Sequence, residues 1–112
     1  MKRIAIQGVP GSFHDIAAHQ YFEGEQIMLI CCDTFEKVFE NIKRDPTVIG
    51  MLAIENTIAG SLLHNYELLR ASGTTIVGEH KLHIQHSICC LPDDDWATLQ
   101  EVHSHPVALM QC

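Results

Sequence analysis

The chain is built around residues 48–70, where a strand pattern, a polar turn and a helix pattern follow one another. Residues 48–54 form a near-continuous apolar run without alternation, which is typical of a strand buried on both faces of a parallel sheet. The helix pattern places Leu62, Tyr66 and Leu69 on one face. The turn between them would lie at the carboxyl end of the strand, where open α/β sheets bind ligands.

Two similar units precede this stretch. Residues 2–7 form a short apolar strand that ends in a Gly/Pro turn, after which Ser12 can cap a helix. Residues 27–32 form a second buried strand, followed by a helix that Asp33 and Thr34 can cap. Three such units in succession predict an α/β fold with a doubly wound parallel sheet.

The remainder of the chain has a different pattern. After Gly73, which ends the third helix, residues 75–91 predict a long extended segment whose second half alternates like a half-buried strand. Residues 96–102 predict a short helix, and Ser104 can cap another. Residues 107–112 stop inside that helix pattern without a glycine cap, so we expect the natural chain to continue into a second lobe.

Composition narrows the class of protein. With 112 residues, 46% of them hydrophobic, the chain is one domain or less of a globular protein. A net charge of −7 argues against nucleic acid or an anionic membrane as a partner. No run has the length or flanks of a signal peptide or a membrane span, so we expect a cytoplasmic protein. Its five cysteines, in the pairs Cys31-Cys32 and Cys89-Cys90 plus Cys112, indicate reduced thiols in the core.

Polar residues at the turn after the third strand are the strongest candidates for a site: Glu55, Asn56, Thr57, Ser61 and Asn65. Ser61 and Asn65 are one helical turn apart and would share a face. The alternative is turn chemistry, in which Asn56 and Thr57 only cap the helix. Backbone N–H groups at the turn containing Pro10 and Gly11 could bind an anion, or the turn could be a plain connection.

Metal and nucleophile chemistry find less support. His83 and His86 would point to opposite faces of a strand, and no carboxylate or thiol completes a set with His103 and His105. Cys112 has no positioned base, so a plain buried cysteine is favoured over a nucleophile. We therefore expect no metal.

Several short segments together resemble prephenate dehydratase in order and spacing over essentially the whole chain. They are Gln7–Ser12, Cys32–Phe35, Ile54–Thr57 with Gly60, Ile76–Glu79, Ser104–Pro106, and Gln111–Cys112. The resemblance implies a cytoplasmic enzyme of phenylalanine biosynthesis that converts prephenate to phenylpyruvate, with loss of water and carbon dioxide and without a cofactor. It also implies two α/β lobes like those of type II periplasmic binding proteins, with residues 1–77 in the first and 78–112 beginning the second.

Carried over by motif, the resemblance places substrate-binding residues on both sides of a cleft. Glu55 and Asn56 would line it from the first lobe, with Ser104 and Gln111 opposite, and Pro10, Gly11, Thr57, Ser61, Asn65 and His105 nearby. The chain departs from the family in having Val107 where a glutamine is usual. The family's catalytic threonine, in a Thr-Arg-Phe motif, lies beyond residue 112, and so does the regulatory ACT domain.

These departures lead to two further expectations. We expect little dehydratase activity from these residues alone, and a non-catalytic lobe that binds a small anion or amino acid is the alternative function. We also expect self-association into a homo-oligomer, because Ile88, Leu91, Leu109 and Met110 would lack cover.

Overall fold

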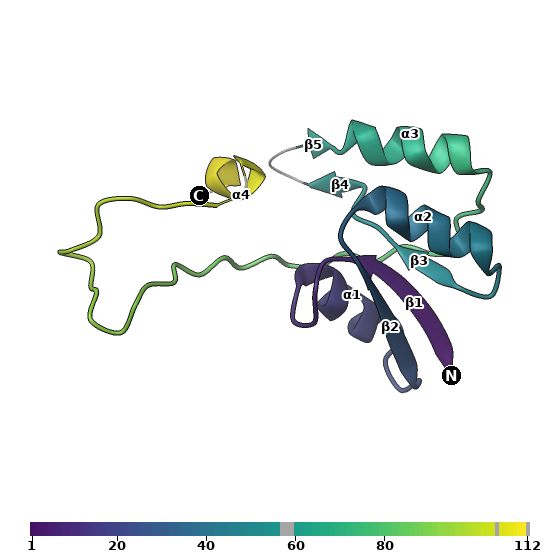
Figure 1. The fold of residues 1–112 in the computed structure, drawn as a ribbon, viewed down its shortest axis with the longest axis horizontal. Coiled ribbons are helices and arrows are strands. Elements are labelled where there is room, and N and C mark those ends of the chain that lie inside the picture. The colour runs from purple at the N-terminus through teal and green to yellow at the C-terminus, as the bar shows by residue number, and fades with distance from the viewer. Residues whose placement is uncertain (57–59, 105, 112) are drawn as a thin grey trace.

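The computed structural model describes residues 1–112 apart from 57–59, 105 and 112. In chain order the elements are β1 (Lys2–Gln7), α1 (Phe13–Tyr21), β2 (Ile27–Cys32), α2 (Phe35–Arg44), β3 (Ile49–Met51), β4 (Glu55–Asn56), β5 (Gly60–Ser61), α3 (Leu63–Ser72) and α4 (Pro106–Gln111) (Figure 1). Strands β2, β1 and β3 form a parallel sheet in that order, and β4 pairs with β5 antiparallel. The predicted α/β class is confirmed, although β3 is shorter than the predicted strand at 48–54.

The central strand β1 is covered on both faces. Successive residues of a strand point to opposite sides, so Ile4 and Ile6 share one face and Ala5 takes the other. Ile4 and Ile6 pack with Ala18 of α1, and Ala5 packs with Val38 of α2; all are buried. Helix α1 therefore covers one face and α2 the other, while α3 packs against α2 (Figure 1).

Predicted helix ends are confirmed at three places. The Ser12 side chain accepts a hydrogen bond from the Asp15 N–H (3.4 Å), and Thr34 Oγ1 accepts one from the Lys37 N–H (3.3 Å). These bonds satisfy N–H groups that have no partner inside the first turn. Gly73 follows α3 at φ 70°, a left-handed conformation that favours glycine.

The strand order creates a switch point at the carboxyl edge of the sheet. The chain runs from β1 outward to β2 and then crosses to β3 on the other side of β1. The connections after β1 (residues 8–12) and after β3 (residues 52–54) therefore leave neighbouring strands in different directions. Such a point is where open α/β sheets bind ligands.

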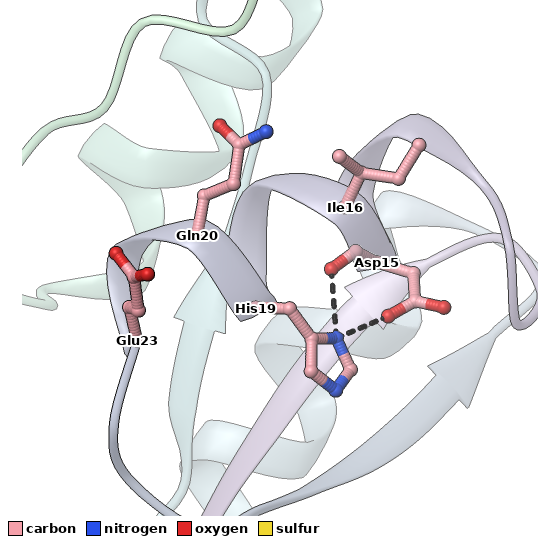
Figure 2. Close-up of a pocket in the computed structure, with 5 residues that line it drawn as sticks. All are labelled: Asp15, Ile16, His19, Gln20 and Glu23. Carbon is pink, nitrogen blue, oxygen red and sulfur yellow. Dashed lines mark hydrogen bonds and ion pairs between the residues drawn. The ribbon is translucent and has the colours of Figure 1, made fainter.

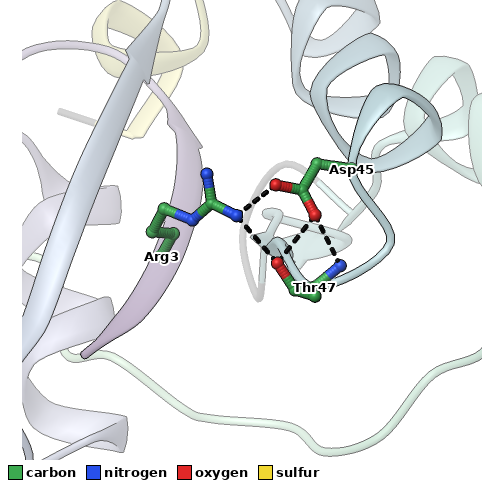
Figure 3. Close-up of polar contacts among 3 residues, drawn as sticks. All are labelled: Arg3, Asp45 and Thr47. Carbon is green, nitrogen blue, oxygen red and sulfur yellow. Dashed lines mark hydrogen bonds and ion pairs between the residues drawn. The ribbon is translucent and has the colours of Figure 1, made fainter.

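The opposite, amino edge is tied together by polar contacts. Arg3, near the start of β1, bonds through Nη2 to the Asp45 carboxylate and to Thr47 Oγ1 (2.8 Å) (Figure 3). Asp45 Oδ1 also accepts bonds from the Thr47 N–H (3.0 Å) and hydroxyl (2.7 Å). These contacts fix the connection between α2 and β3 against β1.

Residues 74–104 differ from the prediction. The predicted half-buried strand within 75–91 and the predicted helix at 96–102 are both wrong. Residues 74–91 have no regular secondary structure, and residues 92–98 form only turns, such as the one closed by the Thr98 N–H on the Asp95 carbonyl (3.1 Å). A strand needs a neighbour for its N–H and C=O groups, and this segment pairs with no described strand. Part of it instead follows α1, where His80 Nε2 lies 2.8 Å from Gln20 Oε1.

Cysteine placement also differs from the prediction. Cys32 is buried, but Cys31, Cys89 and Cys90 are exposed, so a thiol in the core is confirmed only for Cys32; all four are free. Cys112 lies outside the described residues. No helix in the described part of the chain is long and apolar enough to span a membrane.

Candidate active site

The Glu55 carboxylate, in β4 shortly after β3, is exposed to solvent but is oriented by hydrogen bonds. Its Oε1 accepts hydrogen bonds from the Tyr66 hydroxyl (2.7 Å) and the Ser61 hydroxyl (3.2 Å). The bond from Tyr66 to Glu55 raises the pKa of the Tyr66 phenol, so Tyr66 remains a neutral donor. Ser61 also faces Glu55 in the pairing of β4 with β5. The carboxylate is thereby oriented while its side chain remains open to solvent.

The predicted shared helix face of Ser61 and Asn65 is wrong. Ser61 belongs to β5, because α3 begins only at Leu63. Asn65 is 2% exposed, and its Nδ2 donates to the Ala53 carbonyl at 2.7 Å. The structure therefore brings Ser61 to Glu55 and turns Asn65 toward the backbone beside the site. A direct contact from Asn65 to a ligand stays a prediction.

His14 is a neighbour of the site that sequence reasoning missed. Its Nε2 accepts a hydrogen bond from the Ala53 N–H at 3.1 Å, and burial lowers the pKa of its imidazole. The ring meets Phe35, at the start of α2, edge-on with 5.4 Å between centroids. A polar side chain in the first turn after the Gly/Pro loop could have signalled it, because this position borders the carboxyl edge of the sheet.

The turn after β1 already holds a carboxylate. Gly8 and Gly11 have φ of 119° and 89°, and the Ser12 N–H closes the turn on the Val9 carbonyl (3.0 Å). The Gly11 N–H, expected to serve an anionic ligand, donates to Asp15 Oδ2 at 2.6 Å. Pro10 is exposed beside it. The turn can therefore bind a carboxylate, and Asp15 is the one that it binds here.

The other predicted site residues lie less centrally or outside the described residues. Asn56 is partly exposed in β4, opposite Gly60. Thr57 and His105 lie outside the described residues. Ser104 is exposed just before α4, which ends at Gln111 and lies to one side of the sheet and its covering helices (Figure 1). No hydrogen bond between described residues joins Ser104 to Glu55, so their meeting at one site stays a prediction.

Two hollows in the surface lie elsewhere. One, on the outer side of α1, is lined by Asp15, Ile16, His19, Gln20 and Glu23, and His19 Nδ1 approaches both the carbonyl and the carboxylate of Asp15 (3.1 and 2.6 Å) (Figure 2). The other lies between β3, the end of α1 and residues 77–79. Neither hollow includes Glu55, whose side chain is exposed to solvent. Among the described residues, no group of three or more histidine, cysteine and acidic side chains could hold a metal ion.

Comparison with known proteins places the chain in a family. The family model for prephenate dehydratase matches residues 4–112. Arogenate dehydratase 1 of Petunia hybrida is 37% identical over 98% of this chain and 26% of its own length. The bifunctional N-acyl-homoserine lactone acylase/prephenate dehydratase of Komagataeibacter europaeus is 34% identical over 96% of the chain and 38% of its own.

The chain also matches a third relative over a similar share of that relative's length. The bifunctional chorismate mutase/prephenate dehydratase of Escherichia coli K12 is 34% identical over 98% of the chain and 29% of its own length. No solved structure matches. The chain thus spans about a quarter to two fifths of these three relatives. Since the family match covers nearly every residue, the chain belongs to the prephenate dehydratase family.

Proposed function

We propose that this chain forms one wall of the active site of an enzyme that converts prephenate to phenylpyruvate with loss of water and carbon dioxide. The family match over residues 4–112 carries the proposal. The chain spans less than two fifths of the relatives' length, so the activity is proposed for the enzyme of which these residues form a part.

The chemistry of prephenate suggests separate roles for the polar residues. The substrate has two carboxylates and a ring hydroxyl that leaves, and aromatisation drives the reaction. The protein then has to orient a dianion and assist departure of the hydroxyl. A carboxylate repels another carboxylate, so Glu55 suits the hydroxyl-bearing side of the ring. The Asn56 amide suits one substrate carboxylate, and the Gly11 N–H suits the other once the substrate has displaced Asp15 from it.

A second wall would have to close the site. Glu55 is exposed on a rim, and water must be excluded for its charge to act strongly. We propose a two-lobe arrangement like that of type II periplasmic binding proteins, with residues 1–77 in the first lobe and 78–112 beginning the second. The parallel sheet with its switch point at the carboxyl edge supports the first lobe. Ser104 and Gln111, with Thr57, Ser61, Asn65, Pro10 and His105, complete the proposed set of contacts.

Arogenate is a second candidate substrate. Relatives from Petunia and Arabidopsis that are 36–37% identical are named arogenate dehydratases. Arogenate has an amino group where prephenate has a keto group, and the ring that loses its hydroxyl is the same. The residues proposed around the ring would therefore serve either substrate, and a parallel assay of both separates them.

Turnover by the enzyme that includes these residues tests the proposal. Replacing Glu55 with Gln removes the charge but keeps the shape, and we expect kcat/KM for prephenate to fall roughly tenfold to a hundredfold. The matched control is Glu40→Gln on the exposed side of α2, for which no change is expected. Phenylpyruvate formation unaffected by Glu55→Gln would refute the role of Glu55. Prephenate binding without turnover would favour a non-catalytic binding lobe.

We also propose a cytoplasmic enzyme without a cofactor that forms a homo-oligomer. Exposed apolar side chains on residues 74–111 support association, since Ile88, Leu91 and Leu109 are 52%, 73% and 47% exposed. Light scattering over a wide concentration range measures the state of association. A constant monomer mass would contradict this proposal.

A further inference from the structure

The backbone of Ala53 is bound on both sides by side chains from two helices. Its N–H donates to His14 Nε2 of α1 (3.1 Å), and its carbonyl accepts from Asn65 Nδ2 of α3 (2.7 Å). Ala53 lies in the irregular stretch between β3 and β4, where no strand supplies these bonds. Two residues distant in sequence thus replace a missing sheet partner.

The direction of the first bond defines the form of His14. An amide N–H can donate only to an unprotonated ring nitrogen, so the hydrogen of the neutral imidazole must be on Nδ1. Burial lowers the pKa of His14, which keeps the neutral form populated at neutral pH. The edge of the ring rests against Phe35, which restricts its rotation. His14 is therefore a fixed acceptor.

The same stretch leads directly to Glu55, which is proposed to contact the substrate. One residue further, the Ile54 carbonyl accepts from the Leu62 N–H (2.8 Å), and next comes Glu55, bonded to Ser61 and Tyr66. These later contacts all come from residues 61–66. His14 alone, among the described residues that bond to this stretch, comes from α1 and so links it to the other face of the sheet.

We propose that His14 is a positioning residue, which together with Asn65 holds Ala53 and thereby fixes where Glu55 stands relative to the turn after β1. This proposal rests on the proposed function, because the position of Glu55 affects activity only if Glu55 contacts the substrate. His14 itself touches no reacting atom. Its bond to Ala53 sets the separation between a carboxylate on one turn and the N–H groups on the other.

Two substitutions of His14 separate this role from simple packing. In His14→Gln, the amide oxygen is as many bonds from Cα as Nε2 is, so it can accept from the Ala53 N–H. In His14→Asn, the oxygen stands where Nδ1 stood and cannot reach. Both variants lose the ring and its contact with Phe35, so the two differ only in the reach of the acceptor and in one methylene group.

Nuclear magnetic resonance on the 112-residue chain reads the bond itself. Nitrogen shifts of His14 should show the Nδ1-protonated tautomer, and exchange of the Ala53 amide should accelerate about tenfold in His14→Asn but stay near the original rate in His14→Gln. A proton on Nε2, or equal exchange in both variants, would overturn the bond and leave the proposed function untouched.

Turnover of prephenate by the enzyme that includes these residues tests whether His14 positions Glu55. We expect kcat/KM to fall about tenfold in His14→Asn and to be rescued in His14→Gln, with cooperative melting of both variants showing that each remains folded. Equal activity of the two variants would overturn the positioning role. Absence of turnover in the unmodified enzyme, with the Ala53 bond present, would instead refute the proposed function and with it the catalytic role of His14.

Discussion

Residues 2–72 and residues 74–111 contain similar apolar runs but bury them very differently. Ile4 in β1 is 0% exposed, whereas Ile76 and Leu91 in the later segment are 68% and 73% exposed. In the first region each strand has a hydrogen-bonded neighbour and each face has a helix. The second region has neither among the described residues. An apolar run therefore becomes a strand only where partners for its backbone and cover for its side chains exist.

The second region meets the first along α1. His86 packs edge-on against Phe13 (5.5 Å between ring centroids), and Gly78 lies against Tyr21. A Cβ on Gly78 would stand 1.9 Å from the Tyr21 hydroxyl oxygen, so a larger residue there would have to displace the Tyr21 ring. The contact between the two regions thus depends on a few specific residues, while the first region depends on a shared core.

The largest difference between the regions should appear in core substitutions. Ile4→Ala removes a fully buried side chain from the central strand and should lower the free energy of unfolding by about 2–5 kcal/mol. Ile76→Ala, the same change at an exposed position, should alter it by less than about 0.5 kcal/mol. Urea denaturation of both variants measures this. Comparable losses would mean that residues 74–111 have a core of their own.

Asn65→Ala should have the next largest effect. It removes a buried side chain and leaves the partly buried Ala53 carbonyl without its hydrogen bond, which we expect to cost about 1–3 kcal/mol. Gln85→Ala, which truncates an exposed amide in the second region, is the control and should be neutral. Denaturant unfolding again gives the free energies. A neutral Asn65→Ala would show that water replaces the side chain at Ala53.

A smaller effect should appear at the amino edge of the sheet on acidification. Hydrogen bonds from Thr47, and then Arg3, hold the pKa of the Asp45 carboxyl below its ordinary value of 3.8. Because the folded pKa is lower than the unfolded one, the stabilisation is present above the ordinary value and is lost as the pH falls through the folded pKa.

The melting temperature of Asp45→Asn should therefore lie below that of the unmodified chain at neutral pH, and the gap should close in acid. Melting curves between neutral pH and about pH 3 measure it. Asp93→Asn, in the exposed loop of the second region, should show no such gap. A gap that stays constant with pH would contradict the assignment.

The smallest change is expected at Trp96. It is the single tryptophan of the sequence and is 79% exposed in the second region. Unfolding in urea should therefore shift its emission very little, while the helical circular dichroism of the first region is lost. A large blue-shifted signal that disappears with dilution would contradict this and show that another copy of the chain covers Trp96.

Much of the first region could be predicted because its signals are local. Ser12, Thr34 and Gly73 end helices through bonds or conformations within a few residues, and a short range of sequence contains all the information. A strand was wrongly predicted within residues 75–91, because the alternation of apolar and polar residues describes only side chains and does not show whether a neighbouring strand is present. Glu55 was predicted as a site residue, but the hydrogen bonds from Tyr66 to Glu55 and from Ala53 to His14 were not predicted.

The sequence by itself determined the order of the three strand-and-helix units, the helix caps and the place of Glu55 shortly after the third strand, since each depends on neighbouring residues. Only the tertiary structure decided that Tyr66 holds Glu55 and that His14 and Asn65 hold Ala53. His14 and Ala53 are 39 positions apart. They meet because parallel packing brings the ends of β1 and β3 together, and no local pattern encodes that distance.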